Sequence, residues 1–333
     1  MTSTPRRIEL RSADLVLELV STGASVHRLM VAGPDGRETN VVLGHRDVSD
    51  YAAVGGYYGA VVGRVANRID AGRFTLEGVD HQVPANDRGN ALHGGPDGYD
   101  RREWTVEAAG PDTATLSLTS PDGDQGFPGE LQVLVTYTVA PGEVSIDYRA
   151  TTTRTTVVNL TNHAYFNLDG EGHGTVDDHL LTVFADAVTP LRPDGIPTGE
   201  VATVEGTPFD LRSPRRLGDV LAEPSEQLAL AGGLDHNFVL SGSGLRSAAR
   251  LTGGAGLELE VLTDRPGVQV YSGAYFDGTV TGPSGARYPQ RAGIALETQG
   301  FPDAPNRPEF PSVVLPAGET FTSRTVWRFR RPA

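Results

Sequence analysis

The stretch ELQVLVTYTV at residues 130–139 places apolar side chains at every second position, with Leu131, Val133 and Val135 as its clearest members. Successive side chains of a β-strand point to opposite faces, so this period predicts a half-buried strand. Similar alternation recurs in DLVLELV (residues 14–20), TATLSLT (residues 113–119) and GLELEVL (residues 256–262). The chain is therefore expected to fold mainly as half-buried strands.

Turn-forming sequences separate these strands. They are GPDGRE near Asp35, SPDGDQG near Asp122, APGE near Pro141 and RPDGIP near Asp194. The one helical stretch runs from about residue 217 to 230, where Pro224 interrupts it, so any helix there is short. The longest strand-poor region, about residues 185–234, is interpreted as surface loops. With no internal repeat or low-complexity linker, we expect one all-β sandwich domain over residues 1–333.

Composition excludes several classes of chemistry. All 28 basic residues are arginine, so Schiff-base catalysis and a phosphate-binding lysine loop are ruled out. There is no cysteine to act as a nucleophile or metal ligand. A net charge of −14 argues against nucleic acid and anionic membranes as partners, and favours a neutral small molecule. The N-terminal run lacks a signal-peptide pattern, and no apolar run approaches a membrane span, so we expect a cytoplasmic protein.

Two histidines are candidates for proton transfer. His163 lies in TNHAYFNL with Asn159, Asn162 and Asn167 close by, and burying so many amides is costly unless they form hydrogen bonds. His93 precedes two glycines in NALHGG, which would let a ligand or the backbone approach its ring. The structural alternatives are a core histidine held by neighbouring amides and a simple turn.

Five further candidates are polar or acidic residues, of which Asn67 and Arg68 end the strand-like run AVVGRVANRI. Glu297 follows GIAL near a strand end, where apolar surroundings would raise its pKa and make it a base. The alternative places Glu297 on the solvent face of an edge strand. Candidates for binding hydroxyl groups are Asn67, Arg68, Asp235 and Gln269. Arg64, in the same run as Arg68, is interpreted as a structural ion-pair partner instead.

One run resembles a metal site by composition. HGTVDDH contains His173, Asp177, Asp178 and His179. It lies in a polar, glycine-rich segment with no matching set of ligands elsewhere, so we interpret it as solvated surface. No metal and no cofactor are predicted.

In its ordered motifs the chain resembles the aldose 1-epimerases, the galactose mutarotase family. The matching runs extend over nearly the whole chain: NVVLG, GRVANRI, NALHGG, SPDGDQGFPGEL, TNHAYFNL, IPTGEV, FDLR, LDHNF, PGVQVYSG and LETQGFPDAPN. The resemblance implies a large antiparallel β-sandwich with a sugar cleft and without cofactor or metal. It also implies roles: Glu297 as general base, His163 as general acid and His93 as a helper, with Asn67, Arg68, Asp235 and Gln269 binding the sugar.

The implied reaction interconverts the α and β anomers of a free hexose, D-galactose or D-glucose, by opening and closing the ring. Three alternatives share part of this pattern. A hexose-6-phosphate 1-epimerase would need extra arginines at the cleft, and a non-catalytic carbohydrate-binding sandwich would not need His163 and Glu297 together. A glycoside hydrolase using Asp235 and Glu297 would leave both histidines without a role. The protein is expected to be a monomer or a homodimer.

Overall fold

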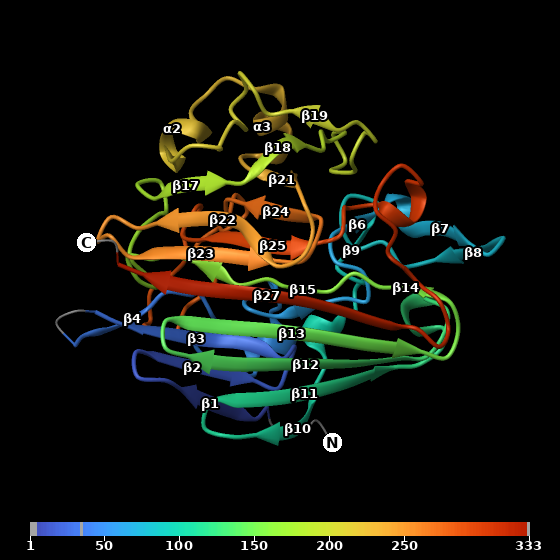
Figure 1. The fold of residues 1–333 in the computed structure, drawn as a ribbon, viewed down its shortest axis with the longest axis horizontal. Coiled ribbons are helices and arrows are strands. Elements are labelled where there is room, and N and C mark those ends of the chain that lie inside the picture. Colours follow the sequence, from blue (N-terminus) through green and yellow to red (C-terminus); the bar gives the residue numbers. More distant parts are fainter. Residues whose placement is uncertain (1–4, 34–35, 332–333) are drawn as a thin grey trace.

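The alternating stretch at residues 130–139 forms β12 (Leu131–Ala140) within a nine-stranded antiparallel sheet of the computed structural model (Figure 1). Leu131, Val133 and Val135 are buried, and the residues between them are exposed or half-buried. The structure describes residues 5–33 and 36–331. In spatial order the sheet contains β10 (Thr105–Ala109), β11 (Thr113–Ser120), β12, β13 (Glu143–Thr152), β27 (Thr320–Arg330), β23 (Glu258–Thr263), β22 (Arg246–Thr252), β17 (Leu180–Val183) and β20 (Arg215–Arg216).

Two smaller antiparallel sheets complete the main layers. The six-stranded sheet contains β16 (Tyr165–Phe166), β25 (Ile294–Gln299), β24 (Gly267–Tyr271), β21 (Asp235–Leu240), β18 (Ala185–Val188) and β19 (Ala202–Thr203). The four-stranded sheet contains β1 (Arg7–Arg11), β2 (Leu15–Val20), β3 (Ser25–Ala32) and β4 (Glu38–Asn40). Short pairs join β5 (Val61–Val62) with β15 (Thr161–Asn162), β6 (Arg68–Ile69) with β9 (Ala91–Leu92), β7 (Arg73–Leu76) with β8 (Val79–Gln82), and β14 (Thr156–Val157) with β26 (Val314–Leu315).

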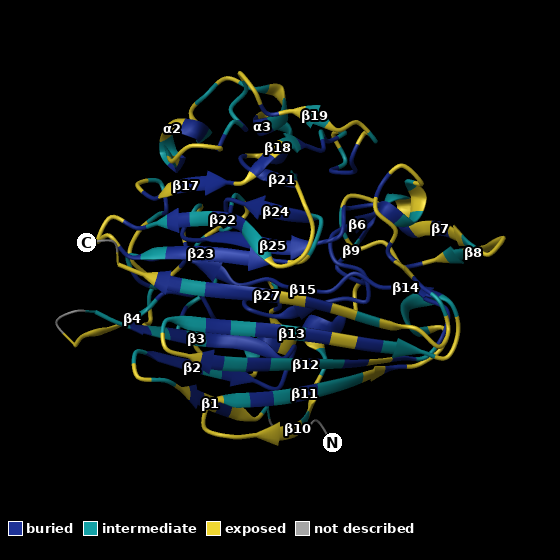
Figure 2. Ribbon diagram, in the orientation of Figure 1, coloured by how far each residue is buried: buried dark blue, intermediate teal, exposed yellow. Residues whose placement is uncertain are grey.

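Side chains from different sheets meet in one apolar core. Phe166 of β16 packs edge-on against Trp327 of β27, with ring centroids 5.1 Å apart. The hydroxyl of Tyr137 on β12 donates to the carbonyl oxygen of Ala24, next to β3, at 2.7 Å. Figure 2 shows buried residues along the central strands and exposed residues at many of the connections and on the β7–β8 hairpin. This packing of antiparallel sheets face to face confirms the predicted all-β sandwich.

Burial differs from the sequence prediction in two strands. In β2 only Glu18 is not fully buried, and in β23 only Glu258 is not. Both strands are therefore covered on both faces, and the prediction that they are half-buried was wrong. A polar residue at alternate positions was read as solvent-facing, but Glu260 of β23 is buried and accepts a hydrogen bond from Ser247 at 2.6 Å. The alternating pattern predicted the positions of the strands correctly, but it did not predict whether both faces of each strand are buried.

The predicted helical stretch is confirmed as two short helices on either side of Pro224. They are α2 (Leu217–Leu221) and α3 (Glu226–Ala231), and the side chain of Ser225 caps α3 by accepting from the Leu228 N–H. The sequence missed α1 (Asp50–Ala53), a single turn too short to show a helical period. The strand-poor region also contains β18, β19 and β20. The predicted turn at Asp35 lies outside the described residues.

Single turns of 3₁₀ helix lie at Asp70–Gly72, Tyr99–Arg101, Asp124–Gly126 and Ala304–Asn306. Among the described residues, no helix is long and apolar enough to cross a membrane.

Candidate active site

Six of the seven predicted site residues line one cavity of about 340 Å³. A volume of this size lies within the range of small-molecule sites. The six are Asn67, Arg68, His93, His163, Asp235 and Glu297. Gln269 is not among the lining residues; it lies directly opposite Glu297 on the neighbouring strand β24. Segments that are far apart in the sequence therefore meet at one place in the fold.

The six-stranded sheet carries the two acidic residues that were predicted for the site, Asp235 and Glu297. Glu297 is the fourth residue of the six-residue strand β25, two residues before the strand ends at Gln299, so it lies near a strand end as predicted. Its side chain is 2% exposed, which excludes the alternative of a solvent-facing edge position. Asp235 is the first residue of β21, which pairs with β24. Both carboxyl groups thus reach the cavity from one sheet.

His163 lies between β15 and β16, where backbone hydrogen bonds fix it on both sides. Its N–H donates to the carbonyl oxygen of Ala60 at 2.8 Å, and its own carbonyl oxygen accepts from Gly59 at 3.0 Å. The neighbouring amides act as predicted, since Asn162 is buried and its Nδ2 donates to the carbonyl oxygen of Gly59 at 2.7 Å. The cluster of asparagines therefore holds the loop around the histidine.

His93 is fixed by Asn67. The N–H of Asn67 donates to Nδ1 of His93 at 3.1 Å, and the N–H of His93 donates to the carbonyl oxygen of Asn67 at 3.0 Å. Because Nδ1 accepts, a neutral His93 must carry its proton on Nε2. Both residues have a positive φ, 63° for Asn67 and 52° for His93. The structure thus presents His93 as a hydrogen-bond donor through Nε2.

The glycine after His93 allows the backbones to approach closely. Gly94 has a φ of 91°, and a Cβ placed on it would lie 2.0 Å from the carbonyl oxygen of Gly63. No other residue type fits such a position. The glycine pair was expected to let the backbone or a ligand approach the histidine closely. At Gly94 it is the protein's own backbone, at Gly63, that comes close.

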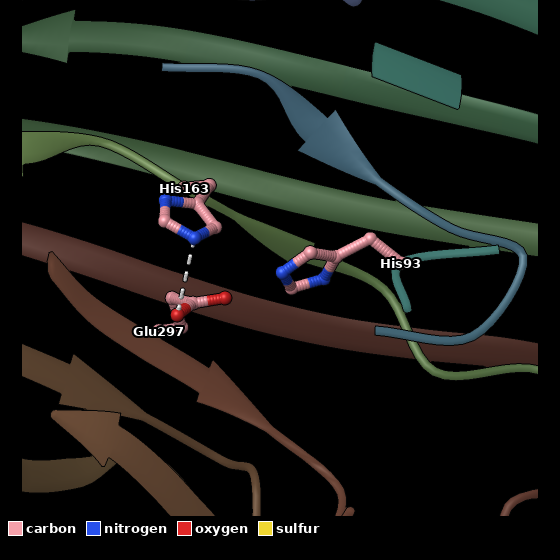
Figure 3. Close-up of side chains that lie close together, drawn as sticks. All are labelled: His93, His163 and Glu297. Atoms are coloured by element: carbon pink, nitrogen blue, oxygen red, sulfur yellow. Dashed lines mark ion pairs between the residues drawn. The ribbon is translucent and has the colours of Figure 1, made fainter. Parts of the chain in front are cut away.

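The carboxyl group of Glu297 and the imidazole of His163 form a buried pair (Figure 3). Nε2 of His163 lies 3.5 Å from Oε1 of Glu297, and the other carboxylate oxygen, Oε2, is buried without a hydrogen-bond partner among the described residues. Burial lowers the pKa of His163 to about 4. Burial also raises the pKa of Glu297 well above its ordinary value; Asp235 adds to the rise and Arg68 opposes it. Burial therefore favours uncharged forms of both groups.

A chain of polar contacts links Asp87, Arg68, Asp235 and Gln269. Nε of Arg68 donates to Oδ2 of Asp87 at 2.7 Å, and its Nη1 lies 3.6 Å from Oδ2 of Asp235. Nε2 of Gln269 donates to Oδ1 of Asp235 at 2.7 Å. Arg68 and Asp235 are thus positioned before any ligand enters. The prediction that Gln269 contacts sugar stays a prediction, and its observed contact is with Asp235.

A metal ion is poorly suited to the same residues. Ligand atoms of His93, His163 and Glu297 lie within 4.8 Å of one another, and two histidines with a glutamate hold zinc in some enzymes. Nδ1 of His93, however, already accepts from the Asn67 N–H, so Nε2 must keep its proton and has no lone pair for a metal. The arrangement is suited to hydrogen bonding and proton transfer.

The HGTVDDH run does not form a comparable cluster within the described residues. Asp177 and Asp178 are not buried and pair with Arg291 and Arg216. His179 is buried, and its Nε2 accepts from the Leu168 N–H at 3.0 Å. The interpretation of this run as solvated surface was therefore wrong for His179, whose ring binds the backbone of the preceding segment at Leu168.

Arg64 has a structural role, as expected, but through different partners. Its guanidinium is buried and donates to the carbonyl oxygens of Pro128 and Gly129 at 2.8 and 2.9 Å, and to the Ser120 hydroxyl at 2.6 Å. The expected ion pair is replaced by these carbonyl contacts.

Sequence reasoning missed two side chains that touch the predicted residues. Asp87 binds Arg68 and lies in a polar turn, six residues before His93, that gives no chemical signal. Tyr57 packs against both histidines of the cavity and lies in the run GGYYG. Glycines on both sides of an aromatic pair were the one available sign of an unusual backbone.

Comparisons with known proteins identify the family of the chain. The aldose 1-epimerase family model matches residues 6–328. Galactose mutarotase from Bos taurus is 46% identical over 98% of this chain and 94% of that protein, and the one from Rattus norvegicus is 45% identical over 97% and 93%. The solved structure of an aldose epimerase homologue from C. elegans has a TM-score of 0.92 at 30% identity, covering 99% of this chain and 100% of that chain. The chain belongs to the aldose 1-epimerase family and is thus an isomerase that interconverts sugar anomers.

Proposed function

We propose that this enzyme interconverts the α and β anomers of a free hexose, D-galactose or D-glucose, with Glu297 as general base and His163 as general acid. One observation carries the assignment: a buried carboxyl and a buried imidazole lie 3.5 Å apart at the wall of a cavity of sugar-binding size. The names of the mutarotase relatives support a hexose as substrate.

The chemistry needs one proton removed and one delivered. The Glu297 carboxylate takes the proton of the anomeric hydroxyl, while protonated His163 gives a proton to the ring oxygen. The bond between C1 and the ring oxygen breaks, and the open-chain aldehyde forms. Rotation about C1–C2 then presents the other face of the aldehyde, and reversal of both transfers closes the ring as the opposite anomer. Each positioned transfer contributes about 10²- to 10⁴-fold in rate.

Burial makes both groups more reactive but disfavours the charged state from which the cycle starts. A carboxylate whose pKa is raised is a stronger base, and an imidazolium whose pKa is lowered is a stronger acid. The two groups share one proton, held either as a neutral pair or as carboxylate and imidazolium, and both states have zero net charge. Ring opening converts the second state into the first. Burial of Glu297 and His163, which favours uncharged groups, therefore also favours the transfer step.

The other residues of the cavity are proposed to bind and orient the sugar. His93 would donate from Nε2 to the ring oxygen or the anomeric oxygen, because Asn67 fixes its proton there. Arg68, Asp235 and Asn67 would bind hydroxyl groups, and Gln269 would keep Asp235 in place. Fixed donors and acceptors lower the entropy cost of aligning the reacting atoms.

The charge of the cavity favours a free sugar over a hexose 6-phosphate. Arg68 is the one arginine among the lining residues, and it already faces Asp87 and Asp235. The acidic lining residues are Asp87, Asp235, Asp277 and Glu297. A phosphate group binds where several donors converge on it, and here it would instead meet carboxyl groups.

Polarimetry of freshly dissolved sugars tests the proposal. We expect fast mutarotation of α-D-galactose or α-D-glucose, and a rate with α-D-glucose 6-phosphate at least about tenfold lower in kcat/KM, a difference of about 1.4 kcal/mol. The Glu297→Gln variant serves as the control for a non-catalytic binding protein, since it should still bind sugar but not speed mutarotation. Preference for the phosphorylated sugar, or full activity of Glu297→Gln, would contradict the proposal.

A further inference from the structure

The segment Gly55–Gly59 has an unusual backbone at the wall of the cavity. Gly55, Gly56 and Gly59 have φ values of 77°, 89° and 67°, and Tyr57 among them has a φ of 61°. Glycine adopts this left-handed region readily, whereas a bulky side chain is rarely found there. The conformation of the turn alone does not explain why a tyrosine occupies this position.

The ring of Tyr57 covers both histidines of the site. Its centroid lies 4.5 Å from that of His93 in an edge-on contact and 5.6 Å from that of His163 in a stacked contact. The two imidazoles are themselves 5.2 Å apart and edge-on. Three rings therefore touch one another, and Tyr57 is the one that is not an imidazole.

Hydrogen bonds hold this segment firmly against the site. Nε2 of His45 lies 2.7 Å from the carbonyl oxygen of Gly55, so that nitrogen carries the proton and donates it. The N–H of Gly59 donates to the carbonyl oxygen of His163 at 3.0 Å. The N–H of Val26 donates to the carbonyl oxygen of Gly59 at 2.9 Å, and a Cβ on Gly59 would lie 2.1 Å from the carbonyl oxygen of Val26, so only glycine fits against β3 here. The same contacts thus fix Tyr57 and the histidine that it covers.

We propose that Tyr57 is a positioning residue, whose ring holds the imidazoles of His93 and His163 in their reactive orientation and keeps water from their shared face. The hydroxyl group is not needed for this role, because both contacts are made by the ring. The proposal rests on the proposed function in one respect: the effect on rate requires that His163 transfers a proton. The contact between the rings does not depend on it.

The charged and titratable groups around His163 determine how its titration is interpreted. They are Glu297 on β25, His93 after β9, Asp235 on β21, and Tyr57, Tyr165 and Tyr271 from three further segments. Burial lowers the pKa of His163 to about 4, and burial is its largest cause. Loss of the covering ring would admit water and raise the pKa toward 6.5, the ordinary value of histidine.

Two substitutions at the same position separate the ring from its hydroxyl. Tyr57→Phe keeps the ring, and Tyr57→Gly removes it while the backbone stays in a conformation that glycine prefers. Glu77→Gly is a matched control, because Glu77 also has a positive φ of 50° but lies at the exposed turn between β7 and β8. All three variants are compared with wild type by polarimetry over pH and by thermal unfolding. His163 is titrated by NMR of histidine-labelled protein, its signal assigned with His163→Asn.

We expect Tyr57→Phe and Glu77→Gly to retain kcat within about threefold. Tyr57→Gly should lose about 10- to 100-fold in kcat with a smaller change in KM, because misplacement of reacting groups by about 1 Å can cost 10²-fold. It should still unfold in one cooperative transition, and the pKa of His163 should rise. An unchanged pKa of His163 in Tyr57→Gly would overturn the proposal, as would an equal loss of activity in Tyr57→Phe. Failure of the proposed function would show instead as full activity of Glu297→Gln or His163→Asn, with the NMR result still decisive for Tyr57.

Discussion

Replacing Glu297 by glutamine should stabilise the fold at neutral pH while it removes the proposed base. The wild-type carboxyl group is 2% exposed, and its Oε2 has no hydrogen-bond partner among the described residues. Burial raises its pKa well above the ordinary value of a glutamate. In the unfolded chain the same group ionises near pH 4.5, so folding must retain a proton that the unfolded chain releases.

Linkage gives the size and the sign of the effect. Above pH 4.5 the unfolded state of the wild type binds fewer protons than the folded state, so its free energy of unfolding decreases with rising pH. The slope from this group is about 1.4 kcal/mol per pH unit until the pKa of folded Glu297 is reached. The Glu297→Gln variant lacks this contribution to the pH dependence of the free energy of unfolding. The stability gained by Glu297→Gln should thus be absent below about pH 4.5 and should grow as the pH rises.

The contribution of His163 is present in both proteins and largely cancels from the difference. Its pKa of about 4 in the folded state lies below the ordinary value of 6.5, so its contribution to stability is lost as the pH falls between those values. This loss amounts to about 3 kcal/mol by the same conversion. The profile of each protein alone therefore mixes two opposite trends, and the comparison of variants separates them.

Urea unfolding of both proteins at pH 5, 6, 7 and 8 measures the effect. With a denaturant slope of about 3 kcal/mol/M, each pH unit of linkage moves the midpoint by about 0.5 M. Asp122→Asn is a control of opposite sign, because the N–H of Gly129 donates to exposed Asp122 and lowers the pKa of its carboxyl group, so its loss should destabilise the fold. A difference between wild type and Glu297→Gln that stays constant from pH 5 to 8 would refute the reasoning, and so would one that shrinks as the pH rises.

Three further outcomes are expected. His163→Asn should lower kcat by about 10²- to 10⁴-fold, and its combination with Glu297→Gln should lose less than the product of the single losses, since the two transfers act together; a multiplicative loss would contradict this. Asp235→Asn and Arg68→Ala should raise KM in steady-state polarimetry with some loss of kcat, because both side chains are proposed to orient the sugar, and wild-type kinetics would place the sugar elsewhere. Dialysis against a chelator should leave the rate unchanged, because Asn67 keeps the proton on Nε2 of His93; a loss restored by zinc would reverse that inference.

The strands and most of the side chains that line the cavity could be predicted because their signals are local. Alternation in a run such as residues 130–139 follows from the geometry of a strand, and six of the seven predicted residues do line one cavity. Whether both faces of a strand are covered depends on segments that are far away in the sequence. Strands β2 and β23 were both predicted to be half-buried from their alternating pattern, but they are covered on both faces, with Glu260 buried and Glu18 only partly exposed.

Partners within the site were also beyond prediction, because they depend on register between strands. Gln269 is directly opposite Glu297 but donates to Asp235, and one residue of slip would turn its side chain to the other face of the sheet. Asp87 and Tyr57 belong to turns whose sequences carry no chemical signal, yet one binds Arg68 and the other covers the histidines. Residue types indicate what chemistry is available, and tertiary contacts determine which atoms are free to perform it.

The protonation of His93 shows how far a backbone contact can determine chemistry. A histidine in sequence has two equivalent choices for its proton, and either nitrogen could be a donor, an acceptor or a metal ligand. Here the N–H of Asn67 occupies Nδ1, and that contact exists because Asn67 and His93 both have left-handed backbone conformations where β6 meets β9. Asparagine tolerates that conformation better than most residues. An asparagine that was expected only to bind a hydroxyl group therefore also makes the neighbouring imidazole a hydrogen-bond donor toward the cavity, as its proposed contact with the ring oxygen or the anomeric oxygen requires.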